Sequence, residues 1–266
     1  SKDLRITPIY GGSDIRKQMR ELKMGSHIVV GTPGRVLDLL KRKNLELNKI
    51  ESVVLDEADE MLNMGFKEDI DSILEGTNSK KQILLFSATM PKEVLKISKN
   101  YMNKPKKIEV DSTNEGVKDL EHNYYLVMNL KDKYQVLRRI CDMNPNVYGI
   151  VFCRTRRECK DISNKLVQDG YNADSLNGDL SQPQRDHVMN RFREKHIQLL
   201  VATDVAARGL DVNNLSHVIN YNLPDENQTY IHRSGRTGRA GKKGISIIIS
   251  SNRDRRKIKS LEKTIN

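Results

Sequence analysis

Two adjacent carboxylates, Asp56 and Glu57, directly follow a short apolar stretch, Val53–Leu55. At the end of a buried strand, such a pair suits phosphoryl transfer. One carboxylate can hold Mg²⁺ on the phosphates of a nucleotide, and its neighbour can orient or deprotonate the attacking water. We expect Asp56 to hold the Mg²⁺, usually through water, and Glu57 to act on the attacking water. The alternative is an acidic helix start that only favours the helix dipole.

A hydroxyl-containing motif, Ser87-Ala88-Thr89, comes after the next apolar stretch, Gln82–Phe86. Taken alone, such a motif most often caps a helix, and Pro91 follows shortly after it. In parallel sheets, however, the carboxyl ends of the strands carry the chemistry. The motif therefore also belongs to the polar strand ends at which we expect the chemistry.

Three arginines are interleaved with small residues in the segment His232–Arg239, which we expect to be a loop. Such a segment cannot form an apolar core, and its glycines allow the backbone to approach a ligand closely. The rigid guanidinium fork matches phosphate oxygens. Arginines that a second domain supplies to a γ-phosphate accelerate its transfer by orders of magnitude. The alternative is a basic surface loop without a ligand.

The charge balance favours a polyanionic partner. Lys and Arg number 46 against 35 Asp and Glu, the net charge is +11, and aromatic residues make up only 5% of the chain. A basic chain of this kind is typical of proteins that bind the backbone of a nucleic acid. The last helix, expected at Asp254–Ile265, lies in an especially basic segment, which either a solvated face or phosphate contact would explain.

Membrane, secretory and metal classes are not indicated by the sequence. No apolar run reaches the roughly 18 residues of a membrane span, and no charged-then-apolar leader opens the chain. The three cysteines, Cys141, Cys153 and Cys159, lack CxxC spacing, so neither a disulfide framework nor a zinc site is expected. A reducing, cytoplasmic setting fits this cysteine usage.

Short β-branched stretches alternate with amphipathic ones, which is typical of the α/β class with parallel sheets flanked by helices on both faces. The strands expected in the first part are His27–Gly31, Ser52–Leu55, Gln82–Phe86 and Lys107–Val110, with helices at Val36–Lys43 and Pro91–Tyr101. The strands expected in the second part are Asn123–Val127, Val147–Cys153, Ala173–Leu176, Gln198–Ala202, His217–Tyr221 and Gly244–Ser250. The other helices are expected at Lys133–Met143, Arg156–Asp169 and Gln184–Lys195. The polar segment Asp111–Glu121 predicts a linker, so we expect a first domain over 1–112, a linker over 113–120 and a second domain over 121–266.

Taken together, the motifs resemble those of the DEAD-box ATP-dependent RNA helicases of superfamily 2. They occur in the family's order: Gly11-Gly12, TPGR (Thr32–Arg35), DEAD (Asp56–Asp59), SAT (Ser87–Thr89), VFCRT (Val151–Thr155), NGDLSQPQR (Asn177–Arg185), ATDVAARGLD (Ala202–Asp211) and HRSGRTGR (His232–Arg239). The resemblance implies two RecA-like domains, the first incomplete, and local, non-processive unwinding of RNA duplexes coupled to ATP hydrolysis with Mg²⁺. The wording of Tyr10-Gly11-Gly12, FSATMP and INYNLP is most similar to a bacterial branch of cold adaptation and ribosome assembly, which implies ribosomal or RNA-decay partners.

The resemblance also implies a role for individual residues. Asp56, Glu57, Arg236 and Arg239 would be catalytic, Asp211 would bind ATP together with the two arginines, and Asp59, Ser87, Thr89 and His232 would couple hydrolysis to strand separation. RNA would lie on Gly12, Thr32, Gly34, Arg35, Arg154, Thr155, Gly178, Gln182, Arg185 and Thr203. Plainer structural roles remain open for three of these features. Thr32-Pro33 could be an ordinary turn, Gln182 and Arg185 a helix-surface pair, and Arg208 a support for its own loop.

The sequence departs from the family at the phosphate-binding loop. A G-x-x-x-x-G-K-[ST] segment is absent, and the nearest Gly/Lys cluster, Gly241-Lys242-Lys243-Gly244, lacks the hydroxyl residue. In the family this loop, the Q motif and the PTREL-type motif would precede residue 1. We therefore expect a fragment with an open sheet edge that hydrolyses ATP poorly by itself. A non-enzymatic RNA-binding or annealing module, or a DNA helicase of the same superfamily, are the alternatives.

Overall fold

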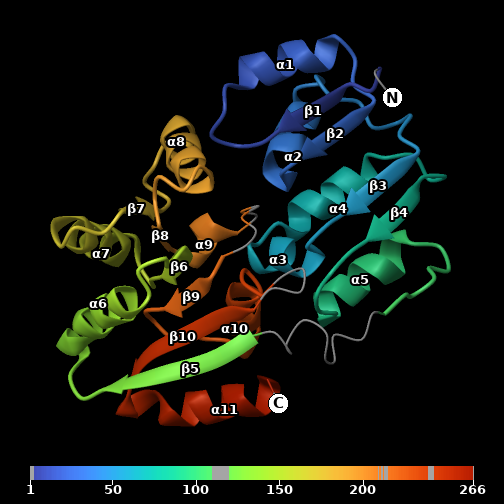
Figure 1. The fold of residues 1–266 in the computed structure, drawn as a ribbon. Coiled ribbons are helices and arrows are strands. Elements are labelled where there is room, and N and C mark those ends of the chain that lie inside the picture. The colour runs from blue at the N-terminus through green and yellow to red at the C-terminus, as the bar shows by residue number, and fades with distance from the viewer. Residues whose placement is uncertain are drawn as a thin grey trace. The chain divides into compact units, whose positions relative to one another are not determined.

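The structure is a computed structural model that describes residues 3–109, 120–208, 210, 212, 215–238 and 243–265. It consists of two compact units, residues 1–109 and 110–266. Each contains parallel strands with helices packed against them, which confirms the expected α/β class (Figure 1). The expected linker, 113–120, lies outside the described residues except for Leu120, where a strand begins.

The first unit contains four short strands and five helices. They follow in the order β1 (Ile6–Ile9), α1 (Ile15–Lys23), β2 (Ile28–Gly31), α2 (Pro33–Lys41), β3 (Ser52–Leu55), α3 (Ala58–Asn63), α4 (Lys67–Glu75), β4 (Gln82–Leu85) and α5 (Lys92–Tyr101). Strand β1 pairs with β2, and β3 pairs with β4, both in parallel. One face of the β3–β4 pair packs on α3, α4 and α5 through Leu55, Ile70 and Val94.

The other face of these strands is apolar and exposed. Val54, Leu84 and Phe86 alternate along the chain with the buried residues of β3 and β4, yet each is more than a third exposed. Strands of parallel sheets are usually apolar on both faces because both are covered. Within the described part of the first unit, no element packs on this second face closely enough to bury it.

Two expectations for the first unit were wrong. The strand predicted at Lys107–Val110 is absent from its described residues, Lys107–Glu109. The Lys107 and Glu109 side chains, on the same side of the extended backbone, form an exposed ion pair, and no described strand offers this segment a hydrogen-bonded partner. Conversely, strand β1 was not predicted; it contains Pro8, and proline is rare within strands. Proline is tolerated there because β1 lies at the edge of its pair.

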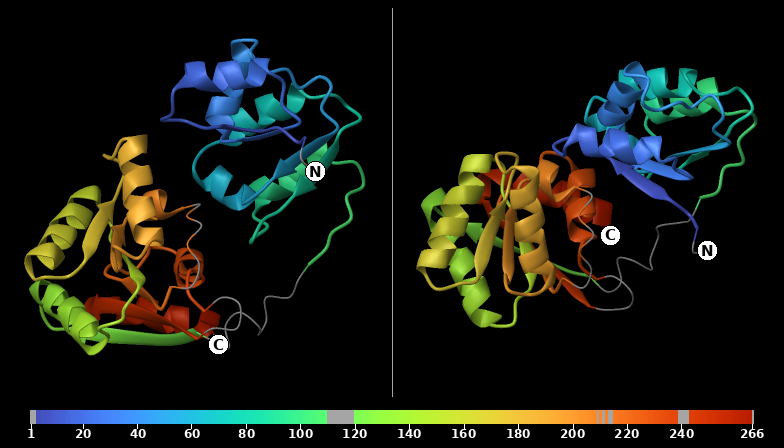
Figure 2. Two further views of the ribbon diagram at one scale, coloured as in Figure 1. Left: turned by 45° about the horizontal axis from the view of Figure 1, so that its top comes forward. Right: turned by 90° about the horizontal axis from the view of Figure 1, so that it is seen from above.

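The second unit is built on a six-stranded parallel sheet (Figures 1 and 2). Its elements are β5 (Leu120–Val127), η1 (Leu130–Asp132), α6 (Lys133–Met143), β6 (Gly149–Phe152), α7 (Arg156–Gln168), β7 (Ala173–Leu176), α8 (Gln182–Arg193), β8 (Leu199–Ala202), α9 (Asp204–Ala207), β9 (His217–Asn220), α10 (Asn227–Ser234), β10 (Gly244–Ser251), η2 (Asn252–Asp254) and α11 (Arg255–Ile265). The strand order is β5-β10-β9-β6-β8-β7.

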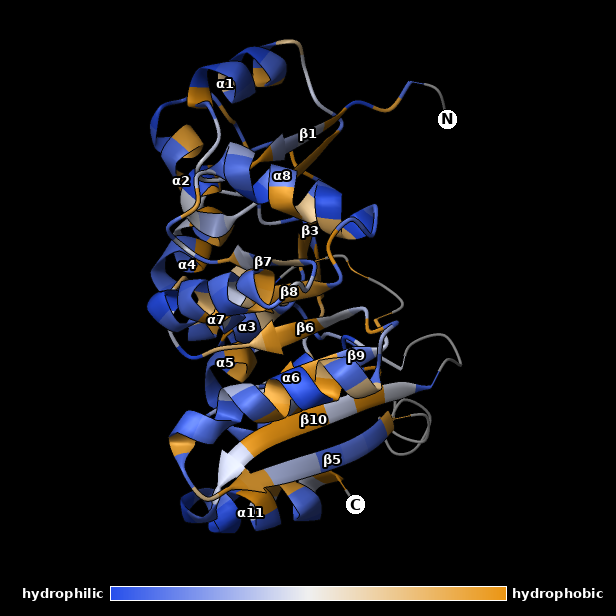
Figure 3. Ribbon diagram, turned by 60° about the vertical axis from the view of Figure 1, so that its left-hand side comes forward, coloured by the Kyte–Doolittle hydropathy of each residue, from blue (hydrophilic) through white to orange (hydrophobic). Residues whose placement is uncertain are grey.

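Helices cover both faces of this sheet. Helices α6 and α7 pack on one face, against Val151, Ile219 and Ile249. Helices α8 and α9 pack on the other face against Ile150 and Phe152, while α10 and α11 cover Ile248 of β10 on that same face. Accordingly, β6 and β10 are coloured hydrophobic over most of their length, whereas the helices alternate (Figure 3).

Helix α10 contradicts the expected loop, because His232, Arg233 and Ser234 lie on it. Helix α8 also differs, since it runs over Gln182–Arg193 and not over Gln184–Lys195. It begins earlier because Ser181 and Gln184 form a capping box, with the Ser181 N–H donating to Gln184 Oε1 at 2.8 Å. It ends earlier because Lys195 adopts a left-handed conformation with φ of 62°.

His217 makes the stability of the second unit depend on pH. Its side chain is 6% exposed at the start of β9, Nδ1 lies 2.9 Å from Ser216 Oγ, and Nε2 has no hydrogen-bond partner among the described residues. Burial lowers the pKa of His217 below its ordinary value of 6.5, as it does for His122. Protonation therefore favours the unfolded chain.

We expect the free energy of unfolding to fall as the pH decreases below about 6.5, towards the lowered pKa of each histidine. Urea midpoints between pH 7.5 and pH 5 would measure this change. His217→Gln should reduce the pH dependence without abolishing it, because the contribution of His122 remains. The same substitution at the exposed His196 should leave it unchanged, and an equal effect of both variants would contradict the assignment.

Candidate functional site

Asp56 and Glu57 lie at the carboxyl end of β3, exposed to solvent. One oxygen of Asp56, Oδ1, accepts a hydrogen bond from the Glu57 N–H at 3.0 Å, and the other accepts none from a described residue. Glu57 adopts a left-handed conformation with φ of 49°, which is uncommon outside glycine and turns the chain sharply into α3. A carboxylate with a free oxygen at a solvent-exposed strand end suits Mg²⁺, which takes hard oxygen donors and retains waters.

Asp59 connects the chain after β3 to the chain after β4. Its carboxylate Oδ2 accepts hydrogen bonds from the Thr89 hydroxyl at 2.6 Å and the Thr89 N–H at 2.9 Å. The Asp59 N–H donates to Ser87 Oγ at 3.2 Å, and the Ser87 hydroxyl donates to the Thr89 carbonyl at 2.6 Å. Asp59 is only 2% exposed. Burial alone would raise its pKa, but the hydrogen bonds from Thr89 and Ser87 hold that pKa below its usual value.

The segments carrying Gly12 and Arg35 lie side by side in the first unit. The Arg35 guanidinium donates through Nη1 to the Ser13 carbonyl at 3.2 Å and to Gln18 Oε1 at 3.0 Å. The buried Gln18 in turn donates to the Tyr10 carbonyl at 3.1 Å. Gly12 has φ of 79°, a conformation that favours glycine. Arg35 therefore fixes the shape of the Gly11-Gly12 turn.

Thr32 and Gly34 begin helix α2 beside this turn. Thr32 is its N-cap with Pro33 at the first position, and the Thr32 side chain makes no capping hydrogen bond. A Cβ atom added at Gly34 would lie 3.4 Å from Asp69 Oδ2, which is an ordinary van der Waals contact. The Thr32 N–H donates to the Ile9 carbonyl at 3.0 Å, whereas the Gly34 N–H lies in the first turn of α2, near the positive end of its dipole.

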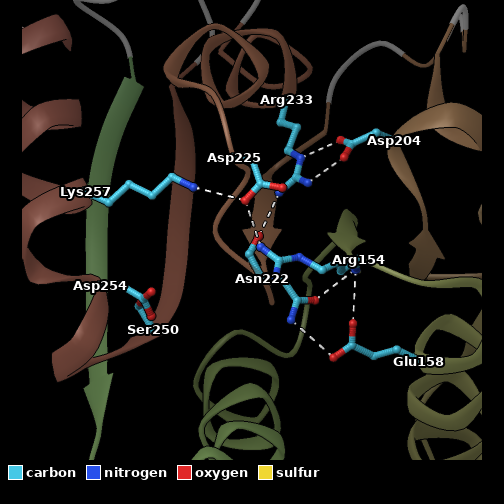
Figure 4. A network of polar contacts seen from close by, with 9 residues as sticks. All are labelled: Arg154, Glu158, Asp204, Asn222, Asp225, Arg233, Ser250, Asp254 and Lys257. Carbon is cyan, nitrogen blue, oxygen red and sulfur yellow. Dashed lines mark hydrogen bonds and ion pairs between the residues drawn. The ribbon is translucent and has the colours of Figure 1, made fainter. Parts of the chain in front are cut away.

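Arg154 and Thr155 follow β6 in the second unit (Figure 4). The Arg154 N–H donates to Glu158 Oε2 and to Asn222 Oδ1, both at 3.0 Å, and its guanidinium donates to Asp225 Oδ1 at 3.0 Å. Thr155 is the N-cap of α7, and its hydroxyl accepts from the Glu158 N–H at 3.1 Å. These contacts fix the backbone at the end of β6 and leave the Arg154 side chain at the surface.

The other candidates in the second unit follow the neighbouring strands β7 and β8. Gln182 donates to Asp186 within α8 at 2.9 Å, whereas Arg185 donates to the Ala206 carbonyl of α9 at 3.1 Å. Arg185 is therefore not a simple surface residue, because it joins two helices. Thr203 is the buried N-cap of α9. Gly178 precedes Asp179, whose carboxylate pairs with Arg156 at 2.7 Å and Lys160 at 2.8 Å.

Arg233, one of the three arginines of the segment His232–Arg239 but not one of the predicted site residues, lies at the centre of this region (Figure 4). It is 4% exposed. Its Nε and Nη2 donate to the two oxygens of Asp204 at 2.6 and 2.7 Å, and Nη1 donates to Asn220 Oδ1 and to the Asn222 carbonyl. The guanidinium also stacks over the Phe152 ring, 4.8 Å from its centroid. The sequence offered one indication of this pairing, the carboxylate of Asp204, which is the third residue of the ATDVAARGLD motif.

The remaining candidates near α10 are placed only in part. Arg236 follows α10 and donates to the Leu210 carbonyl at 2.9 Å, and His232 lies 3.2 Å from the Gln228 amide. Asp211 and Arg239 lie outside the described residues. The described residues hold no group of three or more metal-ligating side chains, so any metal would need ligands from a nucleotide or water. Within the described ranges, no helix has both the length and the hydrophobicity of a membrane span.

Comparison with known proteins places both units in one family. A model described as DEAD/DEAH box helicase matches residues 1–97, and one described as helicase conserved C-terminal domain matches residues 132–241. The DEAD-box ATP-dependent RNA helicase CshA of Bacillus cereus is 47% identical over 99% of this chain and 50% of that protein. CshA of Listeria monocytogenes is 44% identical over the same shares. The chain thus spans about half the length of the curated relatives it matches.

Solved structures agree with this match. A DEAD box protein from Methanococcus jannaschii is 45% identical, with a TM-score of 0.54, over 99% of this chain and 70% of that one. Dbp5 of S. cerevisiae, bound to RNA and ADP BeF3, is 32% identical, with a TM-score of 0.87, over 98% of this chain and 68% of that one.

The buried pair of Arg233 and Asp204 generates a stability prediction. We expect Arg233→Met to lower the free energy of unfolding by about 3 kcal/mol, because it leaves the Asp204 carboxylate and two other acceptors without their donor. Guanidinium denaturation followed by circular dichroism would measure the change. The control is Arg157→Met on the surface of α7, whose weak pair with Asp161 should contribute less than about 0.5 kcal/mol. Similar small losses in both variants would show that the Arg233 network is not structurally important.

Proposed function

The chain belongs to the DEAD-box family of helicases, and on that basis we propose that the protein is an ATP-dependent RNA helicase that separates short RNA duplexes locally. The observation that carries this proposal is the Asp59 network. Through Asp59, it joins the segment that carries the candidate catalytic carboxylates after β3 to Ser87 and Thr89 after β4, at distances of 2.6 to 3.2 Å. A change at the carboxylates on ATP hydrolysis would therefore move the chain after β4.

We assign the hydrolytic roles to two residues of the first unit. Asp56, with one free oxygen, would hold Mg²⁺ through water, and the metal would neutralise charge on the nucleotide phosphates. Glu57, whose left-handed conformation turns the chain into α3, would orient and deprotonate the attacking water. Both carboxylates are exposed, so a nucleotide and water can reach them.

The second unit would supply cations to the nucleotide. We propose Arg236 and Arg239 as the residues that stabilise charge on the γ-phosphate, Asp211 as a ligand of the ribose, and His232 as a coupling residue. The support for Arg236 is its place after α10, whose orientation the buried Arg233 determines. Asp211, Arg239 and His232 are proposed on the match of their motif positions to the family alone.

RNA would be bound by its backbone. The proposed residues are Gly12, Thr32, Gly34 and Arg35 in the first unit and Arg154, Thr155, Gly178, Gln182, Arg185 and Thr203 in the second. Backbone amides, hydroxyls and guanidinium groups suit phosphates and 2′-hydroxyls, which position a strand without selecting its sequence. We further propose that Arg35 and Arg185 act by shaping the RNA-binding loops, because both guanidinium groups donate to backbone carbonyls.

We also propose that this protein acts in the bacterial cytoplasm, in cold adaptation and ribosome assembly, with ribosomal or RNA-decay partners. The wording of the motifs and the similarity to the CshA helicases support a bacterial setting. The three cysteines are all free and buried, which fits a reducing compartment.

Hydrolysis provides the test. The 266 residues contain no G-x-x-x-x-G-K-[ST] segment, so we expect them to hydrolyse ATP poorly by themselves. A longer form that carries such a segment upstream should show RNA-stimulated hydrolysis, and Glu57→Gln should reduce its rate by at least about 100-fold because the water loses its base. Phosphate release measured with and without single-stranded RNA gives both numbers.

The matched control is Glu51→Gln, a carboxylate at the other end of β3, which should leave the rate unchanged. If the longer form binds RNA but does not hydrolyse ATP, the protein is an RNA-binding or annealing module, and the helicase proposal is wrong.

A further inference from the structure

Asp225 is a surface carboxylate shared by two cations from distant parts of the second unit (Figure 4). Its Oδ1 accepts from Arg154 Nη2 at 3.0 Å and from Lys257 Nζ of α11 at 3.2 Å. Lys257, followed by Arg154, lowers the pKa of Asp225. The Asp225 side chain is 83% exposed, so the two cations meet at the surface, and the three groups together carry one net positive charge.

Helix α11 holds Lys257 in a fixed position. Ile258 and Leu261 are buried in a cluster with Leu223 and Tyr230. The helix start is fixed by Asp254, whose Oδ2 accepts hydrogen bonds from Ser250 and Ser251. Packing in the core therefore fixes the position of α11 relative to Arg154.

The two flanks of α11 differ in charge. At about 100° per residue, Lys257 shares its flank of α11 with Ser260 and Thr264, and Arg253 lies in the η2 turn that leads into the helix, four residues before Lys257. The opposite flank carries Arg255, Lys259 and Glu262. We call the side with Arg253 and Lys257 the near flank. Its cations have no described carboxylate as a partner except Asp225.

We propose that the RNA strand placed on Arg154 continues over Asp225 and onto the near flank of α11, where Lys257 and Arg253 bind its phosphates. This inference rests on the proposed function, which places RNA on Arg154. A phosphate would replace Asp225 as the partner of Arg154 and Lys257. The Ser260 and Thr264 hydroxyls on the same flank accept from the Asn227 amide at 3.1 and 2.9 Å, so the phosphate contacts fall to the two cations. An acidic protein partner would need apolar anchors that this flank lacks.

The test compares two double variants that differ only in the flank. Arg253→Gln with Lys257→Gln removes one Arg and one Lys four residues apart on the near flank. Arg255→Gln with Lys259→Gln removes the same two types at the same spacing on the far flank. Fluorescence anisotropy of the 266-residue chain with labelled oligouridylate of about 20 and about 5 nucleotides, over a range of salt, measures the effect. Circular dichroism and urea midpoints check that each variant is folded.

We expect the near-flank variant to bind the long RNA about tenfold more weakly, with the slope of log K against log salt reduced by about 1.4. On the short RNA the change should be less than about threefold, and the far-flank variant should change little on either RNA. Equal losses in the two variants would show only general electrostatic attraction and overturn the proposal.

Two further outcomes separate this inference from the proposed function. If neither variant changes binding while Arg154→Gln weakens it, RNA lies on Arg154 but does not reach α11, and only the inference is wrong. If Arg154→Gln also has no effect, the placement of RNA on Arg154 fails and the inference fails with it. Unchanged RNA binding with lost retention on polyglutamate would indicate an acidic protein partner, which also overturns the proposal.

Discussion

The buried guanidinium of Arg233 is the interaction on which the polar surface of the second unit depends. It donates to Asp204 after β8, to Asn220 of β9 and to the Asn222 carbonyl, and it stacks over Phe152 of β6. Three strand ends are thereby held by one side chain. A buried cation is stable only when its donors are satisfied, so each of these segments has one accessible arrangement. The Arg154 N–H donates to Asn222, so this network also fixes the position of Arg154.

The first unit uses the same principle with the opposite charge. Asp59 is a buried anion whose acceptors are satisfied by Thr89, and the Asp59 N–H donates to Ser87. In both units, a buried charged residue holds together chain segments that follow neighbouring parallel strands. The exposed residues that would contact nucleotide or RNA lie beside these buried groups. The buried side chains therefore keep the site rigid, whereas the exposed side chains are accessible to nucleotide or RNA.

The sequence predicts well what depends on local pattern. The short stretches at Ser52–Leu55 and Ala173–Leu176 form strands with the expected bounds, because strand length is a local property of the sequence. The site was predictable where a motif directly follows a strand, as for Asp56 and Ser87. Arg233 was not, because its role depends on Asp204, Asn220 and Phe152, which are distant in the chain. The strand expected at Lys107–Val110 also failed on tertiary grounds, since a strand needs a partner as well as a propensity.

The pairing of β5 with β10 has a consequence for biosynthesis. Leu120 pairs with Gly244, so the first strand of the second unit is completed by its last. When β5 leaves the ribosome, the strand that it needs is about 120 residues from being translated. Until then β5 presents Tyr124 and Tyr125 without a neighbour, and the nascent chain must remain unpaired along that edge. Closure of the sheet is therefore a late event that follows the emergence of β10, and the speed of translation up to β10 sets how long β5 remains unpaired.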